Sequence, residues 1–298
     1  MKLTCWIIYN GFLPGDTFRD FAEMFGEAAK LRGHKAVLYT NNELISLLDS
    51  DLKIIDHDSY PDYCIFTDKD IYLAKQLEFL GIPVFNSSEA IAISDDKIKT
   101  YQLLTKAKLP IPRTIIAPKT FGLHISFNDN LFDRIIHTFS FPLIVKEAFG
   151  SFGEQVYLVN NEKELRKKVY DISDKPFMFQ EFIKTSYGKD LRLQVVGNEV
   201  VTAMKRTAEN DFRANVTAGG KMDPYQPNET ERKIAVLAAK AIGADFAGID
   251  LLFGENNYPI ICEVNSNAHI RNLLDCTGIN AAHSIVSYIE EKLKEVTS

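Results

Sequence analysis

Short apolar runs alternate with amphipathic segments in the first third of the chain. The apolar runs are predicted to be buried strands, at residues 3–9, 36–39, 63–66 and 82–85. The segments between them are predicted to be helices, at residues 17–31, 42–48 and 71–80. Strands that alternate with helices favour a parallel sheet covered on both faces. We therefore predict an N-terminal α/β unit over residues 1–93.

A helix and an extended passage follow this unit. Residues 94–109 are predicted to form the helix, with Ser94 as its N-cap and Lys97 in its first turn. Lys97 could face a nucleotide, or it could be a solvated lysine on an amphipathic helix. The two prolines in residues 109–112 then stiffen the chain in an extended form.

A loop with two glycines joins two predicted strands, residues 141–146 and 156–159, in the middle of the chain. It contains Gly150, Ser151 and Gly153, whose backbone N–H groups could fold over phosphates, while Lys146 at its base adds a positive charge. A plain hairpin with a surface lysine would explain the same residues. The loop is not a Walker P-loop, because the pattern GxxxxGK[ST] does not occur in the chain.

Large apolar side chains fill the next predicted strand, residues 177–183. This pattern is typical of ordinary core, and equally of a strand that covers an adenine ring with backbone groups near its end. Downstream, Arg206, Arg213 and Lys221 bring together positive charge that suits a carboxylate or a phosphate. A solvated basic surface is the alternative.

Two apolar strands around a turn at residues 254–257 make up residues 246–265. Folding them about the turn sets Asp250 opposite Glu263, and side-chain alternation puts Asn265 on the same face as Glu263. Facing carboxylates repel each other unless a cation lies between them. Two carboxylates and an amide oxygen form a hard oxygen donor set that suits Mg²⁺. Alternatively, Asp250 points to solvent and Glu263 pairs with a lysine or arginine.

Composition and charge limit the kinds of protein and of binding partner that this sequence fits. The 298 residues are 46% hydrophobic and 25% charged, as in ordinary soluble globular proteins, and the formal net charge is −6. This charge argues against nucleic acid or an anionic membrane as a partner. No apolar run approaches the roughly 20 residues that span a bilayer, and the first residues do not form a secretory signal. The four cysteines are widely spaced, so we expect free thiols and a cytoplasmic location.

The order of these motifs resembles the ATP-grasp superfamily, and within it the RimK-type carboxylate–amine ligases. The specific parts are QEFIK before Gly188-Lys189-Asp190-Leu191-Arg192, the run DFRAN at residues 211–215, and Glu263-Val264-Asn265. The resemblance implies an α/β (α+β) ATP-grasp fold behind an N-terminal parallel α/β domain. Its central subdomain would be residues 94–180, and its C-terminal subdomain residues 181–298.

The resemblance also implies the chemistry, in which a carboxylate is phosphorylated by ATP to an acyl phosphate and an amine then attacks. The cofactors would be ATP and Mg²⁺, with Mn²⁺ as an alternative. The substrates would be a small-molecule, amino-acid, peptide or carrier-bound carboxylate and an amine, and the oligomeric state stays open. Other chemistry on this scaffold, such as thiol ligation, or a nucleotide-binding regulatory role without ligation, remains an alternative.

The family pattern implies a role for each matching residue. Phosphates would contact Lys97, Lys146 and the glycine loop with Gly150, Ser151 and Gly153. Adenine would lie against Gln180, Glu181, Phe182 and Ile183, and the ribose against Asp190. Arg206, Arg213 and Asn215 would line the phosphate and substrate side. Mg²⁺ would be held by Asp250, Glu263 and Asn265.

One departure from the family lies directly after the metal-binding strand. RimK-type ligases usually carry Ser-Pro-Gly there, whereas this chain has Ser266-Asn267-Ala268-His269-Ile270-Arg271. His269 and Arg271 could bind a second carboxylate, or His269 could accept the proton of the amine. The alternative is a loop that only caps the hairpin. The substrate is therefore not transferable from the family.

Overall fold

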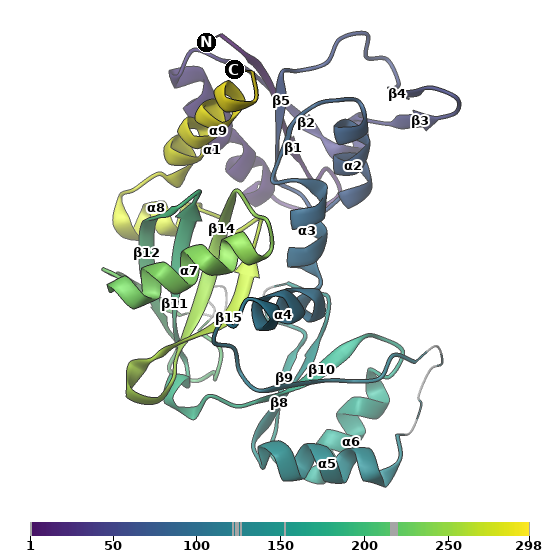
Figure 1. The fold of residues 1–298 in the computed structure, drawn as a ribbon, viewed down its shortest axis with the longest axis vertical. Coiled ribbons are helices and arrows are strands. Elements are labelled where there is room, and N and C mark those ends of the chain that lie inside the picture. The colour runs from purple at the N-terminus through teal and green to yellow at the C-terminus, as the bar shows by residue number, and fades with distance from the viewer. Residues whose placement is uncertain are drawn as a thin grey trace.

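The fold was described from a computed structural model, which covers residues 2–120, 122, 125, 127–151, 153–214 and 220–297. Three main sheets follow one another along the long axis of the molecule (Figure 1). The predicted residue Asn215 lies outside the described residues. No helix in the described part of the chain combines the length and apolarity needed to cross a membrane.

The N-terminal sheet is parallel, as the sequence predicts. Its strands lie in the order β2-β1-β5-β6 and comprise β1 (Thr4–Tyr9), β2 (Lys35–Thr40), β5 (Tyr63–Phe66) and β6 (Val84–Phe85). The helices of this unit are α1 (Thr17–Leu31), α2 (Ile71–Phe79) and α3 (Ser88–Asp95). Apolar faces of α1 and α2 are buried against the sheet, which accounts for the alternating pattern.

The helix predicted at residues 42–48 is wrong. The chain makes a single 3-10 turn, η1 (Asn41–Glu43), and then a small hairpin of β3 (Ser46–Leu48) and β4 (Leu52–Ile54). Glu43 caps the 3-10 turn by accepting from the backbone of Thr40, and Asp49 accepts from the backbone of Asp51 in the hairpin turn. Local turn chemistry therefore outweighs the weak helical spacing of the apolar residues.

The second sheet is antiparallel and carries the predicted glycine loop. Its order is β7-β10-β8-β9, with β7 (Thr114–Ile116), β8 (Leu143–Glu147), β9 (Val156–Val159) and β10 (Phe177–Glu181). Helices α5 (Asp129–Phe139) and α6 (Glu162–Asp171) pack their apolar side chains against it (Figure 1). Helix α4 (Lys97–Lys106) connects this unit to the N-terminal one.

The predicted start of that connecting helix is also wrong. Asp96 is the N-cap of α4, because its carboxylate accepts from the backbone N–H groups of Ile98 and Lys99. Ser94 instead lies in the last turn of α3. Its hydroxyl accepts from the backbone of Ser266 and donates to the carbonyl of Val264. A tertiary contact therefore engages the serine that the sequence suggested as a cap.

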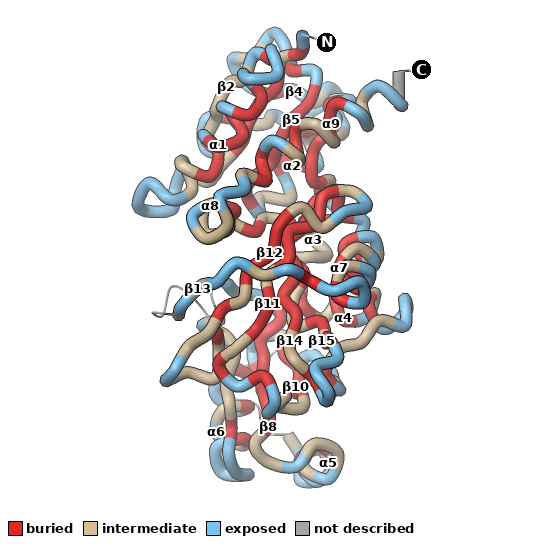
Figure 2. The backbone as a smooth tube through the Cα atoms, turned by 90° about the vertical axis from the view of Figure 1, so that its left-hand side faces the viewer, coloured by how far each residue is buried: buried red, intermediate tan, exposed pale blue. Residues whose placement is uncertain are grey.

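The third sheet is antiparallel, in the order β13-β12-β11-β14-β15, and it carries the predicted acidic hairpin. The strands are β11 (Lys189–Val196), β12 (Glu199–Thr207), β13 (Lys221–Pro224), β14 (Phe246–Phe253) and β15 (Pro259–Asn265). Two short 3-10 turns, η2 (Lys184–Ser186) and η4 (Glu255–Asn257), lie before β11 and between β14 and β15. The predicted register of the hairpin is confirmed, since Asp250 pairs with Glu263. Buried residues run along the central strands of this sheet (Figure 2).

Three helices complete the C-terminal part, namely α7 (Glu229–Ala241), α8 (Arg271–Thr277) and α9 (Ala281–Thr297). Helix α7 covers the third sheet and begins with a capping box of Asn228 and Glu231. Helix α9 returns to the N-terminal unit and lies beside α1 (Figure 1). There Ile285, Val286 and Ile289 join the same core as the β1 residue Ile7.

Candidate active site

A cleft separates the second and third sheets and gathers most of the predicted site residues. It contains about 940 Å³ of space not occupied by atoms, part of it open to solvent, which is in the range of small-molecule sites. The predicted residues that line it are Lys97, Lys146, Gly150, Gly153, Gln180, Glu181, Phe182, Ile183, Asp190, Arg206, Arg213, Asp250 and Glu263. These residues come from both sheets, so the cleft exists only in the folded protein.

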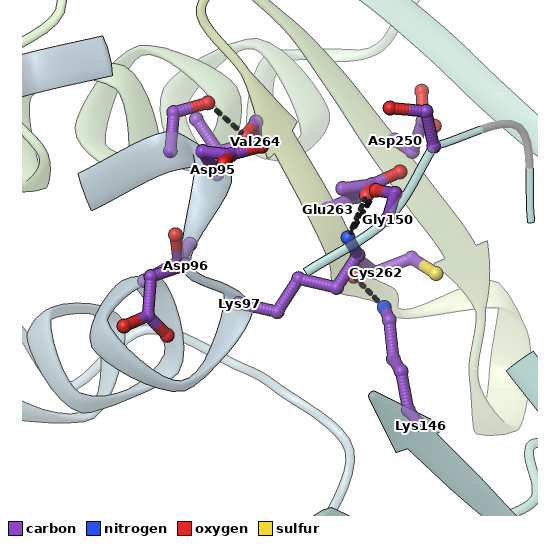
Figure 3. Close-up of polar contacts among 12 residues, drawn as sticks. Asp95, Asp96, Lys97, Lys146, Gly150, Asp250, Cys262, Glu263 and Val264 are labelled. Carbon is purple, nitrogen blue, oxygen red and sulfur yellow. Dashed lines mark hydrogen bonds and ion pairs between the residues drawn. The ribbon is translucent and has the colours of Figure 1, made fainter. Parts of the chain in front are cut away.

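Two buried lysines enter the cleft from different elements (Figure 3). Lys97 is the first residue of α4, and its Nζ donates to the carbonyl of Gly150 at 2.7 Å. Lys146 lies on β8, and its Nζ donates to the carbonyl of Cys262 at 3.3 Å. Burial lowers the pKa of Lys97, although the carboxylate of Glu263, 3.6 Å away, opposes this shift. Each amine donates to a neutral carbonyl, and Lys97 also lies within ion-pair distance of Glu263, so both retain N–H groups for an anionic ligand.

A chain of alternating charges runs across the neighbouring strands β12, β11 and β14. Arg206 donates to both carboxylate oxygens of Asp190, at 2.7 and 2.6 Å, and lies 3.0 Å from Asp250. Arg192 donates to both oxygens of Asp250, each at 2.6 Å. Burial opposes ionisation of Asp250, but the two arginines outweigh it and lower its pKa to about 2. Asp190 has to share Arg206, and there burial prevails and raises the pKa.

The predicted metal ligands lie at the end of the hairpin. Burial opposes ionisation of Glu263, but Lys146 and Lys97 outweigh it and lower the pKa of this carboxylate. The buried amide nitrogen of Asn265 has no hydrogen-bond partner, so the hydrogen-bonding capacity of this amide is incompletely used. The described residues contain no group of three His, Cys, Asp or Glu side chains placed to hold a metal. Two carboxylates and an amide oxygen nevertheless fit Mg²⁺, which prefers oxygen ligands and usually retains waters or takes phosphate oxygens.

The glycine loop closes one side of the cleft. Gly150 has a φ of +133°, and a Cβ atom on it would lie 2.1 Å from the side chain of Gln155. Gly153, with a φ of +74°, offers its carbonyl to Arg213 at 2.6 Å. The loop thus needs glycine for its conformation at both positions. It also brings Arg213 into the cleft opposite the two lysines.

Besides Asn265, the structure places three predicted residues away from the cleft lining. The hydroxyl of Ser151 accepts from Lys69 at 3.1 Å. His269 stacks on Phe21 of α1 with ring centroids 4.6 Å apart, and burial lowers its pKa. Arg271 forms an ion pair with Asp20, which also belongs to α1. The loop of residues 266–271 is therefore held against the first helix of the N-terminal unit.

Arg192 and Tyr101 are candidate site residues that the sequence reasoning missed. Tyr101 follows Lys97 by one helical turn, and its hydroxyl donates to the same Cys262 carbonyl that accepts from Lys146. The spacing of four residues after Lys97 was a usable signal. Arg192 alternates with Asp190 on β11, but only the register with β14 reveals that it faces Asp250.

Comparisons with known proteins bear on the family and the fold of the chain. The model of the RimK-like ATP-grasp domain matches residues 94–289. A probable alpha-L-glutamate ligase of Legionella pneumophila (strain Corby) is 35% identical over 227 residues, which is 75% of this chain and 72% of that protein. An uncharacterized MG012 homolog of Mycoplasma pneumoniae is 37% identical over 210 residues, 69% of this chain and 72% of that protein.

Two solved structures show the same fold over nearly the whole chain. The D-alanine–D-alanine ligase of Bacillus anthracis complexed with ATP has a TM-score of 0.74 at 18% identity, covering 99% of this chain and 98% of that one. The ATP-grasp ligase PsnB complexed with minimal precursor, Mg and ADP has a TM-score of 0.71 at 16% identity, covering 97% and 98%. At these identities the likeness establishes the fold.

Proposed function

The chain belongs to the RimK-like ATP-grasp family, and we propose that it joins an amino-acid or peptide carboxylate to an amine, with L-glutamate as the first amine to test. The chain is an ATP-dependent carboxylate–amine ligase by family. L-glutamate is suggested by relatives from Legionella and Shewanella that are named probable alpha-L-glutamate ligases. The observation that carries the proposal is the convergence of Lys97 and Lys146 on the carboxylate of Glu263 within one cleft.

The reaction divides into two steps. A substrate carboxylate oxygen attacks the γ-phosphorus of ATP, so that an acyl phosphate forms and ADP leaves. The amine then attacks the acyl carbon, inorganic phosphate leaves, and the amine proton passes to a base or water. No protein nucleophile is needed, and positioning with charge stabilisation supplies the catalysis.

Each cationic side chain of the cleft has a distinct task in this proposal. Lys97 and Lys146 exchange their carbonyl acceptors for phosphate oxygens, and Arg213 holds the glycine loop over the phosphates. Mg²⁺ held by Asp250, Glu263 and Asn265 would offset charge on the transferring phosphoryl group. Gln180 to Ile183 enclose the adenine, and Asp190 binds the ribose.

We propose the predicted division at residues 93/94 and 180/181 as the functional units, with the nucleotide between the second and the third. A cytoplasmic location is proposed because all four cysteines are free and two of them are buried. Mn²⁺ is proposed as a metal that can replace Mg²⁺, since both take octahedral oxygen sites.

Release of ADP in the presence of MgATP and hydroxylamine tests the proposal. Hydroxylamine converts an acyl phosphate into a hydroxamate, so a panel of amino acids, dipeptides and small acids identifies the carboxylate. The Glu263→Gln variant should be inactive, whereas Glu209→Gln, which changes a carboxylate exposed on the surface, should match the wild type. ATP binding without ADP release across the panel, or full activity of Glu263→Gln, would contradict the proposal.

A further inference from the structure

One buried carboxylate outside the cleft lacks a cationic partner. Seven carboxylate side chains are buried among the described residues, and five of them have a lysine or arginine within 4.0 Å. Of the other two, Glu231 caps helix α7. The remaining one is Asp68, which is 8% exposed and forms no ion pair within the described part of the chain. An unpaired buried carboxylate is costly, and a cationic ligand would offset that cost.

Asp68 lies just after the carboxyl end of β5, at the edge of the N-terminal sheet where parallel sheets commonly bind ligands. From β1 the sheet extends to β2 on one side and to β5 on the other, so the carboxyl ends of β1 and β5 flank a topological switch point. Open α/β sheets bind ligands in the crevice at such a point. Asn10 follows β1 and Asp68 follows β5, and the amide nitrogen of Asn10 lies 3.2 Å from each oxygen of Asp68.

The surroundings hold Asn10 in place and keep the nearest lysine away. The amide oxygen of Asn10 accepts from the backbone of Phe12 and Leu13, so the amide nitrogen is turned towards Asp68. Lys69 follows Asp68 in the sequence, yet its Nζ contacts Asp95 at 2.5 Å and Ser151 at 3.1 Å. Asp68 thus keeps a single amide group as its side-chain partner, and its carboxylate oxygens have capacity for further donors.

The carboxyl ends of β1 and β5 adjoin the candidate active site. The amide of Asn267, two residues beyond the proposed metal ligand Asn265, donates to the backbone carbonyl of Asp68. On the other side, Lys69 reaches Ser151 in the glycine loop. Asp68 and Lys69 therefore connect the end of the proposed metal-binding strand with the loop proposed to hold the phosphates, which places Asp68 next to the proposed reaction site.

We propose that Asp68 and Asn10 form a subsite for the ammonium group of an amino-acid substrate. An ammonium carries one positive charge and three N–H donors, so it supplies both the charge and the hydrogen bonds that Asp68 lacks. This inference rests on the proposed ligase function for its place in the reaction, but its binding test needs no turnover.

Calorimetric titration of the full chain, saturated with MgADP, tests the subsite. The probes are amino acids paired with their des-amino counterparts, beginning with L-glutamate and glutarate. The wild type should bind at least one amino acid about tenfold or more tightly than its counterpart. The Asp68→Asn variant should lose this preference, whereas Asp70→Asn, which keeps a helix-capping side chain two residues away, should retain it.

Stability provides a second readout that separates binding from structure. Because a neutral amide is cheaper to bury than an unpaired carboxylate, Asp68→Asn should be at least as stable as the wild type in urea. A preference that survives in Asp68→Asn, the absence of any preference in the wild type, or a strong loss of stability would overturn the subsite. A wild type that prefers the ammonium compounds but forms no hydroxamate would uphold the subsite and refute the ligase proposal.

Discussion

Asp250 and Glu263 offer the same chemistry to a metal, but the structure predicts that their loss has different effects on stability. The side chain of Asp250 is 6% exposed, bonded to Arg192 through both oxygens and close to Arg206. The side chain of Glu263 is 29% exposed and lies 3.6 Å from Lys97. We therefore compare Asp250→Asn with Glu263→Gln in protein free of metal and nucleotide.

The expected difference follows from two independent estimates. Removing one partner of a buried ion pair costs about 3–5 kcal/mol, because the charge left behind is uncompensated. The pKa of Asp250 falls from 3.8 to about 2, and at about 1.4 kcal/mol per pKa unit this is worth roughly 2–3 kcal/mol. We expect Asp250→Asn to lower the free energy of unfolding by about 3 kcal/mol. Glu263→Gln should lower it by about 1 kcal/mol or less, since its ion pair is long and partly solvated.

Urea unfolding at pH 7 with a chelator present measures this difference, and ADP release with MgATP restored measures activity. Both variants should lose turnover, while only Asp250→Asn should unfold at a much lower urea concentration. Glu209→Gln, which breaks an exposed pair with Lys221, serves as the control and should unfold like the wild type. Equal loss of stability in the two site variants would refute the argument that Arg192 and Arg206 determine how much stability is lost in Asp250→Asn.

Three further changes have defined outcomes. Because the folded pKa of Asp250 is depressed, its contribution to stability is present above about pH 4 and is lost as the pH falls through about 2; urea unfolding of wild type and Asp250→Asn should converge across this window, and a constant gap would be contrary to the expectation. Lys146→Met removes a buried cation from the cleft and should weaken MgATP about 30-fold or more in a calorimetric titration; unchanged affinity would exclude the phosphate role. Asn86→Ala deletes four hydrogen bonds to the backbone of Asp245, Phe246 and Ser266 and should lower the free energy of unfolding by about 3–4 kcal/mol in urea, so a loss below about 1 kcal/mol would show that water replaces the amide.

The parts of the site predicted from the sequence are those with local geometry. Strand alternation and one turn place Asp250 close to Glu263, because residues in a short hairpin have few other registers. The pairing itself also depends on a register shift between Asp250 and Leu251, which only the structure shows. The glycines at residues 150 and 153 indicate a loop whose backbone conformation favours glycine, and both have positive φ angles in the structure. That these motifs meet in one cleft was predicted from the family resemblance, because no local sequence pattern shows which distant strands become neighbours.

The errors and omissions concern contacts between residues far apart in the sequence. Ser94 has the chemistry of a cap, but its hydroxyl is engaged by residues 264 and 266 of a strand some 170 positions away. His269 and Arg271 are polar residues beside the metal strand, and the ring of Phe21 and the carboxylate of Asp20 hold them against α1. Long-range packing determines the contact partners of these side chains, and no short stretch of the sequence predicts that packing.

Contacts across the cleft suggest how the proposed nucleotide binding can be favourable although the cationic side chains already have partners. Lys97 donates to the carbonyl of Gly150, Lys146 to that of Cys262, and Arg213 to that of Gly153. Each cation thus bonds to one neutral oxygen, in addition to the ion pairs of Lys97 with Glu263 and of Arg213 with Asp211. A phosphate oxygen in place of the carbonyl offers the same hydrogen bond with a negative charge added. Hydrogen bonds between two charged groups are roughly twice as strong as neutral ones. Exchange of the three carbonyl partners for phosphate oxygens keeps these hydrogen bonds and adds the attraction of the phosphate charge.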